Sequence, residues 1–467
     1  MISLILLFPL VACLILFLIK NRALNNIMII LYAIIHLICS VCLCFDYNPS
    51  DINQNFFATD NLNKIFLIVL SIVFFAVSFY NAAYMKYDKS LTRKLRHYSY
   101  AVLLFVLSMT GAILSTNLGI NWVFIEATTL ASAYLIYFHK TKHSIEAAWK
   151  YVFICSIGIA LAFVGIILLG AAEGDLNSLF YNDLYSNAKS FEPFWLKLSF
   201  IFILFGIGTK MGLAPVHFWL PDAHAQSPSP ISALLSATLL NSAFLMIVNV
   251  FKIMKLAGCD FYAKLILFVM GFISLFIAAV FVYHIKNYKR MLAYSSVENM
   301  GILAIGLALG GVGMAASLIH LIGHSFIKAA FFMTSGNILK IYKTKKIKSV
   351  TGILSCDNKT GWLWILSFLG IAAFPPSVLF ISEFLIVKTM FKQEHYIMGA
   401  LFLLLLTIVL YGLGKAVINM SANNGAQEKV KLSQLMYIPQ IVLLAVSFIL
   451  GIYFPFYGYI MSTAQGF

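Results

Sequence analysis

Long apolar stretches, each close to twenty residues, follow one another along the whole chain. The hydrocarbon core of a bilayer takes about 20 helical residues to cross. Hydrophobic residues make up 61% of the 467 residues and charged residues only 10%, whereas a soluble domain is about one quarter charged. A segment in lipid must satisfy its own backbone hydrogen bonds, as a helix does. We therefore expect an all-α polytopic membrane protein.

The apolar stretches define about fourteen predicted spans, and loop charge alternates with the span number. The spans lie near 2–19, 25–44, 62–85, 97–114, 118–138, 145–171, 196–221, 230–254, 262–285, 291–310, 313–341, 361–391, 396–420 and 434–461. Basic residues follow odd-numbered spans: Lys20, Arg22, Lys86, Lys89, Arg93, Lys94, Arg96, Lys140, Lys142, Lys286, Lys289, Arg290, Lys343, Lys345, Lys346 and Lys348. Acidic residues follow even-numbered spans: Asp46, Asp51, Asp60, Glu173, Asp175 and Asp183. Because basic loops are typically cytoplasmic, we expect both termini on the non-cytoplasmic side of a cytoplasmic (inner) membrane.

The composition argues against nucleic-acid binding, metal binding and redox chemistry within this chain. The net charge of +15 comes from short basic clusters at span ends, as membrane topology predicts. Cys39, Cys42 and Cys44 lie at the end of an apolar stretch, where packing within a membrane helix is the simpler explanation, so no metal site and no cofactor are expected. The longest polar connection, 172–192, is too short to form a core of its own. Redox chemistry would therefore have to come from partner subunits.

Ionisable residues lie inside several predicted spans. An ion at the bilayer centre costs at least about 2.5–3.5 kcal/mol on insertion scales, and such residues usually mark ion or proton paths. The candidates for a proton path are Glu126, Lys150, Lys210, Glu298, His320, His324, Lys328 and Glu383. Glu126, Lys210 and Glu383 have apolar residues on both sides, so packing alone gives little reason for them.

Simpler explanations exist for some of these residues. Lys150 lies near a helix end, where its side chain could reach the membrane surface. A single buried histidine is more often a hydrogen-bonded packing residue than a proton carrier. His320, His324 and Lys328 are spaced four residues apart, however, so they share one helix face, and three such residues together favour a relay.

Proline residues interrupt two of the spans that carry these charges. Lys210 precedes Pro215 in the seventh span, and Glu383 follows Pro375 and Pro376 in the twelfth. Proline breaks a membrane helix where the freed carbonyls face protein or water. Interrupted segments at corresponding positions of two halves indicate inverted repeats with a midplane site.

Spans four to eight align with spans nine to thirteen, so that Glu126 corresponds to Glu298 and Lys210 to Glu383. A pair of kinked helices without ion transport is the alternative.

In the transport interpretation, burial disfavours an ammonium group and a nearby carboxylate favours it. A chain of Glu, Lys, His and water could then pass protons through the membrane. Moving one charge against 100 mV takes roughly 2.3 kcal/mol, which a partner has to supply.

Four stretches resemble the antiporter-like proton-conducting subunits of complex I, Mrp cation/proton antiporters and energy-converting hydrogenases. They are KMGLAPVHFWLPDAHAQSPSPISALLSATLLNSA (210–243), YSSVENMG (294–301), HLIGHSFIKAAFFMTSGN (320–337) and PPSVLFISEF (375–384). The resemblance extends roughly from Asp60 to Lys415. It implies fourteen core helices and two inverted five-helix repeats with broken seventh and twelfth helices. Glu126 and Lys210 would be the channel's charge pair, His320, His324 and Lys328 its relay, and Glu383 its terminal site.

The resemblance is closest to the hydrogenase-4 type, component F, because of Glu298, Asn241 and the HSFIK stretch. Other branches often have Lys where Asn241 stands, and this branch usually has His where Asn299 stands. The implied organisation has four parts: helices 1–3 (1–96), a first repeat of helices 4–8 (97–254), a second repeat of helices 9–13 (262–420) and helix 14 (434–467).

Three functions remain open. The first is a proton-translocating subunit of a multi-subunit hydrogenase-like or complex I-like oxidoreductase, with other membrane subunits and a peripheral cytoplasmic redox module as partners. The chain itself would carry no redox centre in such an enzyme. The second is an Mrp-type subunit that exchanges Na⁺ for H⁺. The third is the proton-conducting membrane half of an inorganic-carbon uptake complex.

Overall fold

The computed structural model describes residues 1–19, 21–45, 56–86, 92–174, 178–422 and 430–464. Lys20, Asp46, Asp51, Lys89 and Asp175, which contribute to the loop-charge pattern, lie outside these ranges. The described residues are almost entirely helical and form no β-strand beyond isolated bridges. The predicted all-α class is confirmed.

The chain forms two compact units. The first unit comprises Met1–Ser78, Asp88–Gly212 and Thr238–Ile266, and the second comprises Phe79–Tyr87, Leu213–Ala237 and Leu267–Phe467. The boundaries predicted for the two repeats stay a prediction.

The first unit contains α1 (Ile2–Leu18), α2 (Arg22–Phe45), α4 (Thr92–Leu114), α5 (Leu118–Tyr137), α6 (Lys142–Glu173), α7 (Tyr181–Asn187), α8 (Pro193–Met211) and α11 (Leu240–Leu256). Most of α3 (Asn61–Lys86) and the first residues of α12 (Asp260–His284) also belong to it. Side chains set several helix starts: Asn117 accepts hydrogen bonds from the first turn of α5, and Thr141 forms a capping box with Ser144 at α6. Such caps satisfy backbone N–H groups that have no partner within the helix.

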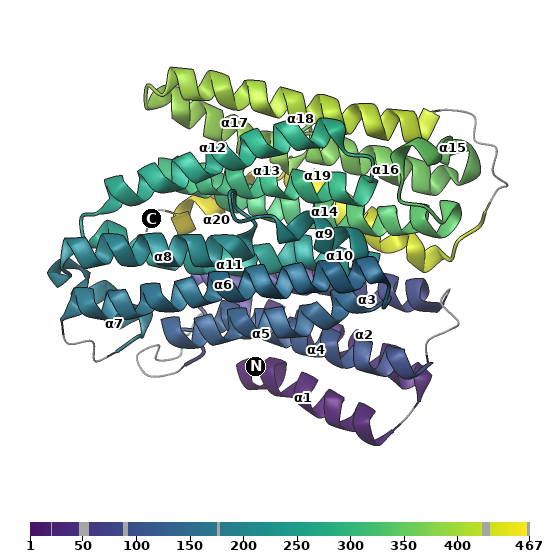
Figure 1. Cartoon of the computed structure of the whole chain (residues 1–467), viewed down its shortest axis with the longest axis horizontal. Helices are drawn as coiled ribbons and strands as arrows, with labels where there is room; N and C mark the ends of the chain where they lie inside the picture. The colour runs from purple at the N-terminus through teal and green to yellow at the C-terminus, as the bar shows by residue number, and fades with distance from the viewer. Residues whose placement is uncertain (20, 46–55, 87–91, 175–177, 423–429, 465–467) are drawn as a thin grey trace. The chain divides into compact units, whose positions relative to one another are not determined.

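The helices α6 and α8 lie side by side in the first unit (Figure 1). Glycine permits this close approach, because a Cβ atom added at Gly206 would lie 2.5 Å from both the Ala162 nitrogen and the Gly158 oxygen. Small residues commonly allow membrane helices to approach at the backbone. The contact positions Lys210, near the end of α8, against the face of α6 that carries Tyr151.

The second unit is built around one long buried helix, α14 (Val312–Tyr342). Against it pack α13 (Tyr288–Leu309), α16 (Asn358–Ile371), α17 (Val378–Lys392), α19 (Ile438–Leu450) and α20 (Phe454–Ala464). The unit also holds α9 (Trp219–Gln226), α10 (Ser229–Leu234), most of α12, α15 (Ile353–Cys356) and α18 (Tyr396–Ala422). A π-helical turn spans Leu235–Leu239. The residues proposed to form a relay therefore lie on a helix enclosed by its neighbours.

Both predicted interruptions are present. The helix α8 ends at Met211 with Gly212 as its C-cap, whose φ of 80° is left-handed, and α9 begins only after Pro215. The helix α16 ends at Ile371, and α17 begins after Pro375 and Pro376, with Ser377 as its N-cap. Proline lacks the N–H that would continue a helix, which explains both breaks.

The count of fourteen spans is not confirmed. Within the described ranges, 11 helices are long and apolar enough to cross a membrane, or 12 if the bent pair α19 and α20 is one span. The difference has structural causes: α1 has 17 residues, and the predicted twelfth span is divided into α16 and α17, with 14 and 15 residues.

Candidate functional site

Lys210 lies in the last turn of α8 with its side chain fully buried. Its Nζ atom donates to the hydroxyl of Tyr151 at 2.9 Å and to the Thr128 Oγ1 atom at 3.2 Å. The Tyr151 ring also lies beneath it, with its centroid 5.0 Å from Nζ. A hydroxyl both donates and accepts hydrogen bonds, so these partners suit an ammonium as well as a neutral amine.

A chain of hydroxyl groups leads away from Lys210. The Tyr151 hydroxyl lies 2.6 Å from the Ser132 Oγ atom, and Ser132 in turn donates to the carbonyl oxygen of Thr128. Because Ser132 uses its hydrogen on that carbonyl, Tyr151 donates to Ser132 and accepts from Lys210. Sequence reasoning missed Thr128, Ser132 and Tyr151. Their polarity within apolar helices was the available signal.

Glu126 is half-buried on α5, and its Oε2 atom accepts a hydrogen bond from Thr129 Oγ1 at 3.1 Å. It forms no direct ion pair with Lys210 in the described structure, although the two groups interact electrostatically. Thr129 contacts Glu126, and the neighbouring residue Thr128 contacts Lys210. The two charged groups therefore interact without a direct hydrogen bond between them.

Lys150 lies elsewhere on α6. Its Nζ atom is 2.6 Å from the Glu146 Oε1 atom, and the two side chains are 47% and 55% exposed. An exposed pair four residues apart is typical of a helix surface. The structure does not bring Lys150 to the buried Lys210 network, and its part in a proton path stays a prediction.

His320 is held between α13 and α17 in the second unit. Its Nε2 atom lies 2.9 Å from the Asn299 Oδ1 atom, and its Nδ1 atom lies 2.9 Å from the Ser382 Oγ atom. The Asn299 amide nitrogen donates to the Ser295 carbonyl oxygen, which leaves Oδ1 as the acceptor. The hydrogen of a neutral His320 ring is therefore assigned to Nε2.

Lys328 lies two turns further along α14 and is fully buried. Its Nζ atom donates to the Leu292 carbonyl oxygen at 2.7 Å and to the Ser295 hydroxyl. Both acceptors belong to α13. Lys328 also interacts electrostatically with Glu298 on the same helix as these acceptors.

His324 lies between His320 and Lys328 on α14. It is fully buried, and neither ring nitrogen hydrogen bonds to any described residue. A buried polar group without a protein partner usually has an ordered water. His320, His324 and Lys328 thus share one helix face, as predicted, and His324 has the bonding capacity for water on both sides of its ring.

Glu298 and Glu383 line one cavity of about 290 Å³. Glu298 extends from α13 and Glu383 from α17, and the cavity is otherwise bounded by α16, α17 and α18. The structure thus brings together two carboxyl groups that come from distant parts of the sequence.

Two further buried ionisable residues were missed as site residues. Lys289 was assigned to a basic loop, which is wrong: Asn287 caps α13, so Lys289 falls in its first turn. Its side chain is fully buried and donates to the Ser227 carbonyl oxygen at 2.7 Å. His224 stacks on Phe332, with 4.7 Å between ring centroids, and has no hydrogen-bond partner among the described residues. The helix-capping residue Asn287 is the sequence feature that could have placed Lys289 in the first turn of a helix.

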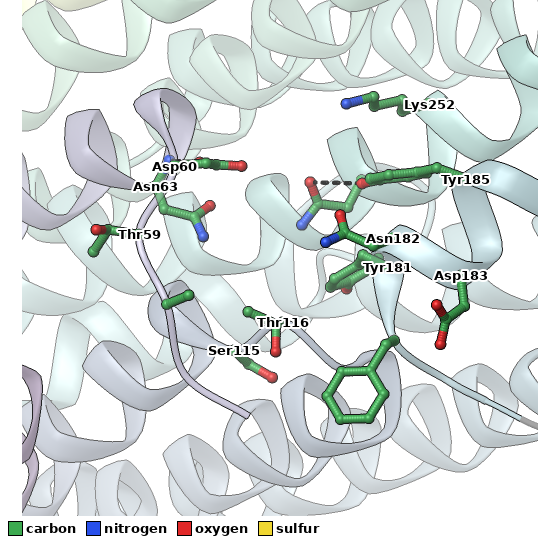
Figure 2. A pocket seen from close by; sticks show the side chains of 13 residues that line it. Thr59, Asp60, Asn63, Ser115, Thr116, Tyr181, Asn182, Asp183, Tyr185 and Lys252 are labelled. Carbon is green, nitrogen blue, oxygen red and sulfur yellow. Dashed lines mark hydrogen bonds between the residues drawn. The ribbon is translucent and has the colours of Figure 1, made fainter. Parts of the chain in front are cut away.

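A polar pocket of about 120 Å³ lies elsewhere in the first unit (Figure 2). Residues at the start of α3, including Asp60 and Asn63, form one side, and residues of α7 form another. Tyr185 donates to Asn249 at 3.4 Å, and the Lys252 ammonium lies 4.4 Å from the Tyr185 ring centroid. Its polar lining and its size suit ordered water molecules.

Comparison with known proteins gives consistent results. A sequence profile described as NADH:quinone oxidoreductase/Mrp antiporter, TM, matches residues 115–410, which include all eight candidate site residues. The "Hydrogenase-4 component F homolog" of Methylacidiphilum infernorum (isolate V4) is 32% identical over 97% of this chain and 96% of its own. A Na(+)/H(+) antiporter subunit of Alkalihalophilus pseudofirmus is 27% identical over 79% of this chain and 76% of its own.

A solved structure has the same fold. It is a chain of the membrane-bound sulfane sulfur reductase, described as an archaeal respiratory membrane complex, with a TM-score of 0.90 at 21% identity. The match covers 100% of this chain and 97% of the other.

Proposed function

Because the chain belongs to the NADH:quinone oxidoreductase/Mrp antiporter transmembrane family, we propose that it translocates protons as a membrane subunit of a multi-subunit hydrogenase-like or complex I-like oxidoreductase. The observation that carries this proposal is Lys210. It is a fully buried basic group whose described hydrogen-bond partners are the hydroxyls of Thr128 and Tyr151. A cation placed so deeply gains little for the fold, and hydroxyl partners accommodate both of its protonation states.

In the first unit, Lys210 is the group that takes up and releases the proton. Glu126 acts on it through space, since Thr129 and not Lys210 occupies its carboxylate. Neutralising or moving the Glu126 carboxylate changes the free-energy difference between the ammonium and the amine of Lys210. This change is the switch between holding and releasing a proton.

In the second unit, Lys328, His324 and His320 form the relay along α14, and Glu298 and Glu383 receive its proton. His320 is oriented by Asn299 and Ser382. His324, without a described partner, connects to its neighbours through water. The electrostatic interaction between Lys328 and Glu298 supports their assignment to one path.

The energy for transport comes from partner subunits. The relatives named above include components of multi-subunit membrane complexes. We assign the redox centres to a peripheral cytoplasmic module and the chain to the inner membrane. The basic loops favour a topology with both termini on the non-cytoplasmic side.

A second candidate function is cation/proton antiport. The similarity to a Na⁺/H⁺ antiporter subunit, at 27% identity, favours it. Transport that requires Na⁺ and proceeds without an electron donor would distinguish antiport from redox-driven pumping.

The test is Lys210→Ala in the assembled complex in inverted membrane vesicles. We expect donor-driven proton uptake to fall at least about tenfold, which corresponds to about 1.4 kcal/mol, with subunit levels unchanged. Lys210→Arg should also fail, because arginine is effectively never deprotonated. Lys197→Ala is the matched control, since Lys197 lies on the same helix and its Nζ atom lies 5.8 Å from the centroid of the Tyr262 ring. Wild-type pumping by Lys210→Ala at normal subunit levels would refute the proposal.

A further inference from the structure

The cavity that Glu298 and Glu383 line in the second unit combines carboxyl groups with apolar side chains. The carboxyl groups come from α13 and α17. Phenylalanine side chains of α17 and leucine side chains of α18 contribute much of the apolar lining: Phe380, Phe384, Leu403, Leu406, Leu410 and Leu413. Its volume of about 290 Å³ is close to the lower limit of about 300 Å³ for small-molecule sites.

The oxygen atoms of both carboxyl groups can accept hydrogen bonds, but no described residue donates one to them. Glu298 is only 7% exposed, yet no described residue hydrogen bonds to it or forms an ion pair with it. Glu383 likewise accepts no hydrogen bond from a described residue. The cation that interacts with Glu298 is Lys328, whose ammonium is occupied by the Leu292 carbonyl and the Ser295 hydroxyl. A buried carboxylate is costly without a hydrogen-bonded partner.

The helix break adds further acceptors at the same place. Ile371 and Ala372 line the cavity at the end of α16. Their carbonyl oxygens would normally accept from the nitrogen atoms four residues later, which belong to Pro375 and Pro376 and carry no hydrogen. The described lining of the cavity thus offers carboxyl and freed backbone carbonyl acceptors and includes no cation.

Two apolar residues of the cavity lining are also exposed at the surface of the second unit. Phe384 is 56% exposed and Leu403 is 45% exposed. A bound molecule would therefore need an apolar body for these side chains and a donor-rich, positively charged group for the acceptors. An anion would be repelled by the carboxyl groups, and a neutral apolar molecule would leave them unpaired.

We propose that this cavity binds a protonated lipophilic amine, with its ammonium group between Glu298 and Glu383 and its apolar body against Phe380, Phe384 and the leucine residues of α18. The ammonium supplies three N–H donors, which match the carboxylate and carbonyl oxygens. This site is independent of whether the chain moves protons. An amine bound here would nevertheless occupy both carboxyl groups and so block any proton transfer through them.

Binding of dansylcadaverine to the purified complex in lipid nanodiscs tests the proposal. This primary amine has an apolar fluorophore, whose emission rises on transfer from water to an apolar site. We expect saturable binding, and N-acetyl-dansylcadaverine, which has lost its charge, should bind at least roughly tenfold more weakly. Glu298→Gln and Glu383→Gln should each weaken amine binding by a similar factor, while Glu394→Gln, an exposed residue after α17, should leave it unchanged.

A second pair of variants distinguishes a loss of amine binding from a loss of folding. Leu410→Trp should fill part of the cavity and weaken binding although both carboxyl groups remain. Glu298→Asp keeps the charge and should retain most of the affinity that Glu298→Gln loses. Equal affinity for the amine and its acetylated analogue, or unchanged affinity in Glu298→Gln, Glu383→Gln and Leu410→Trp, would overturn the proposal. The assay requires no transport, so Lys210→Ala should bind the amine normally whether or not it pumps.

Discussion

The Nε2 atom of His320 lies 2.9 Å from the Oδ1 atom of Asn299, so an uncharged amide of α13 fixes the ring of this histidine on α14. Because Asn299 also donates to the Ser295 carbonyl oxygen, its side chain cannot turn without losing both hydrogen bonds. The ring of His320 is thereby held toward Ser382 on α17.

Asn299→Leu should therefore weaken both the fold and proton transport. The change keeps the approximate volume but leaves a buried N–H of His320 without an acceptor, which costs about 1–3 kcal/mol. We expect a lower thermal unfolding midpoint of the purified complex and slower proton uptake in vesicles. Ser382→Ala removes the other ring contact and should act in the same direction. Unchanged transport in a destabilised Asn299→Leu complex would limit His320 to a structural role.

Tyr151→Phe should reduce proton uptake by about tenfold, or about 1.4 kcal/mol, with little loss of assembly. The ring and its packing stay, but Lys210 loses its 2.9 Å hydroxyl partner. The double variant with Lys210→Ala should be little worse than Lys210→Ala alone, because the two residues act as one unit. Tyr137→Phe on α5 is the control. Additive losses in the double variant would show that Tyr151 acts outside the Lys210 site.

Glu126→Gln should shift the pH profile of transport while the complex stays intact. Glutamine preserves the shape and the contact with Thr129 but removes the charge that acts on Lys210. Without that charge, burial acts on the ammonium unopposed, so the profile should move toward lower pH. Glu146→Gln, which removes the exposed partner of Lys150, should leave the profile unchanged. An intact complex with an unchanged profile would rule out Glu126 as the switch.

Cysteine labelling should test the membrane topology. In a background without the seven native cysteines, Lys348→Cys should react with a membrane-impermeant maleimide from the cytoplasmic side only. Lys189→Cys, in the short 3-10 turn that follows α7, should react from the opposite side. Both positions are exposed. Reaction of both from one side would contradict the alternation of basic and acidic loops on which the topology rests.

The sequence predicts the helices and their breaks well, because apolar length and proline act locally. The break after Lys210 follows from Gly212 and Pro215, and the break before Glu383 follows from Pro375 and Pro376. The span count is less accurate, since a helix such as α16 ends earlier than the apolar stretch that contains it.

Side-chain partners were harder to predict because they come from different helices. Glu126 and Lys210 do lie in one unit, but the hydrogen-bond partners of both are threonine and tyrosine hydroxyls. Lys289 looked like a loop charge because basic residues surround it in the sequence, yet the cap at Asn287 directs it into a buried helix turn. No spacing in the sequence shows that Glu298 and Glu383 share a cavity, which depends on how α13, α17 and α18 pack.

The contact between α6 and α8 at Gly158 and Gly206 determines how Lys210 and Tyr151 are able to respond to a signal. The main chains already touch there, so the helices cannot draw closer, and even the methyl group of an alanine at Gly206 would push them apart. The two backbones therefore cannot approach further at this point. A movement of the Lys210 ammonium toward α6 has to come from rotation about its side-chain bonds.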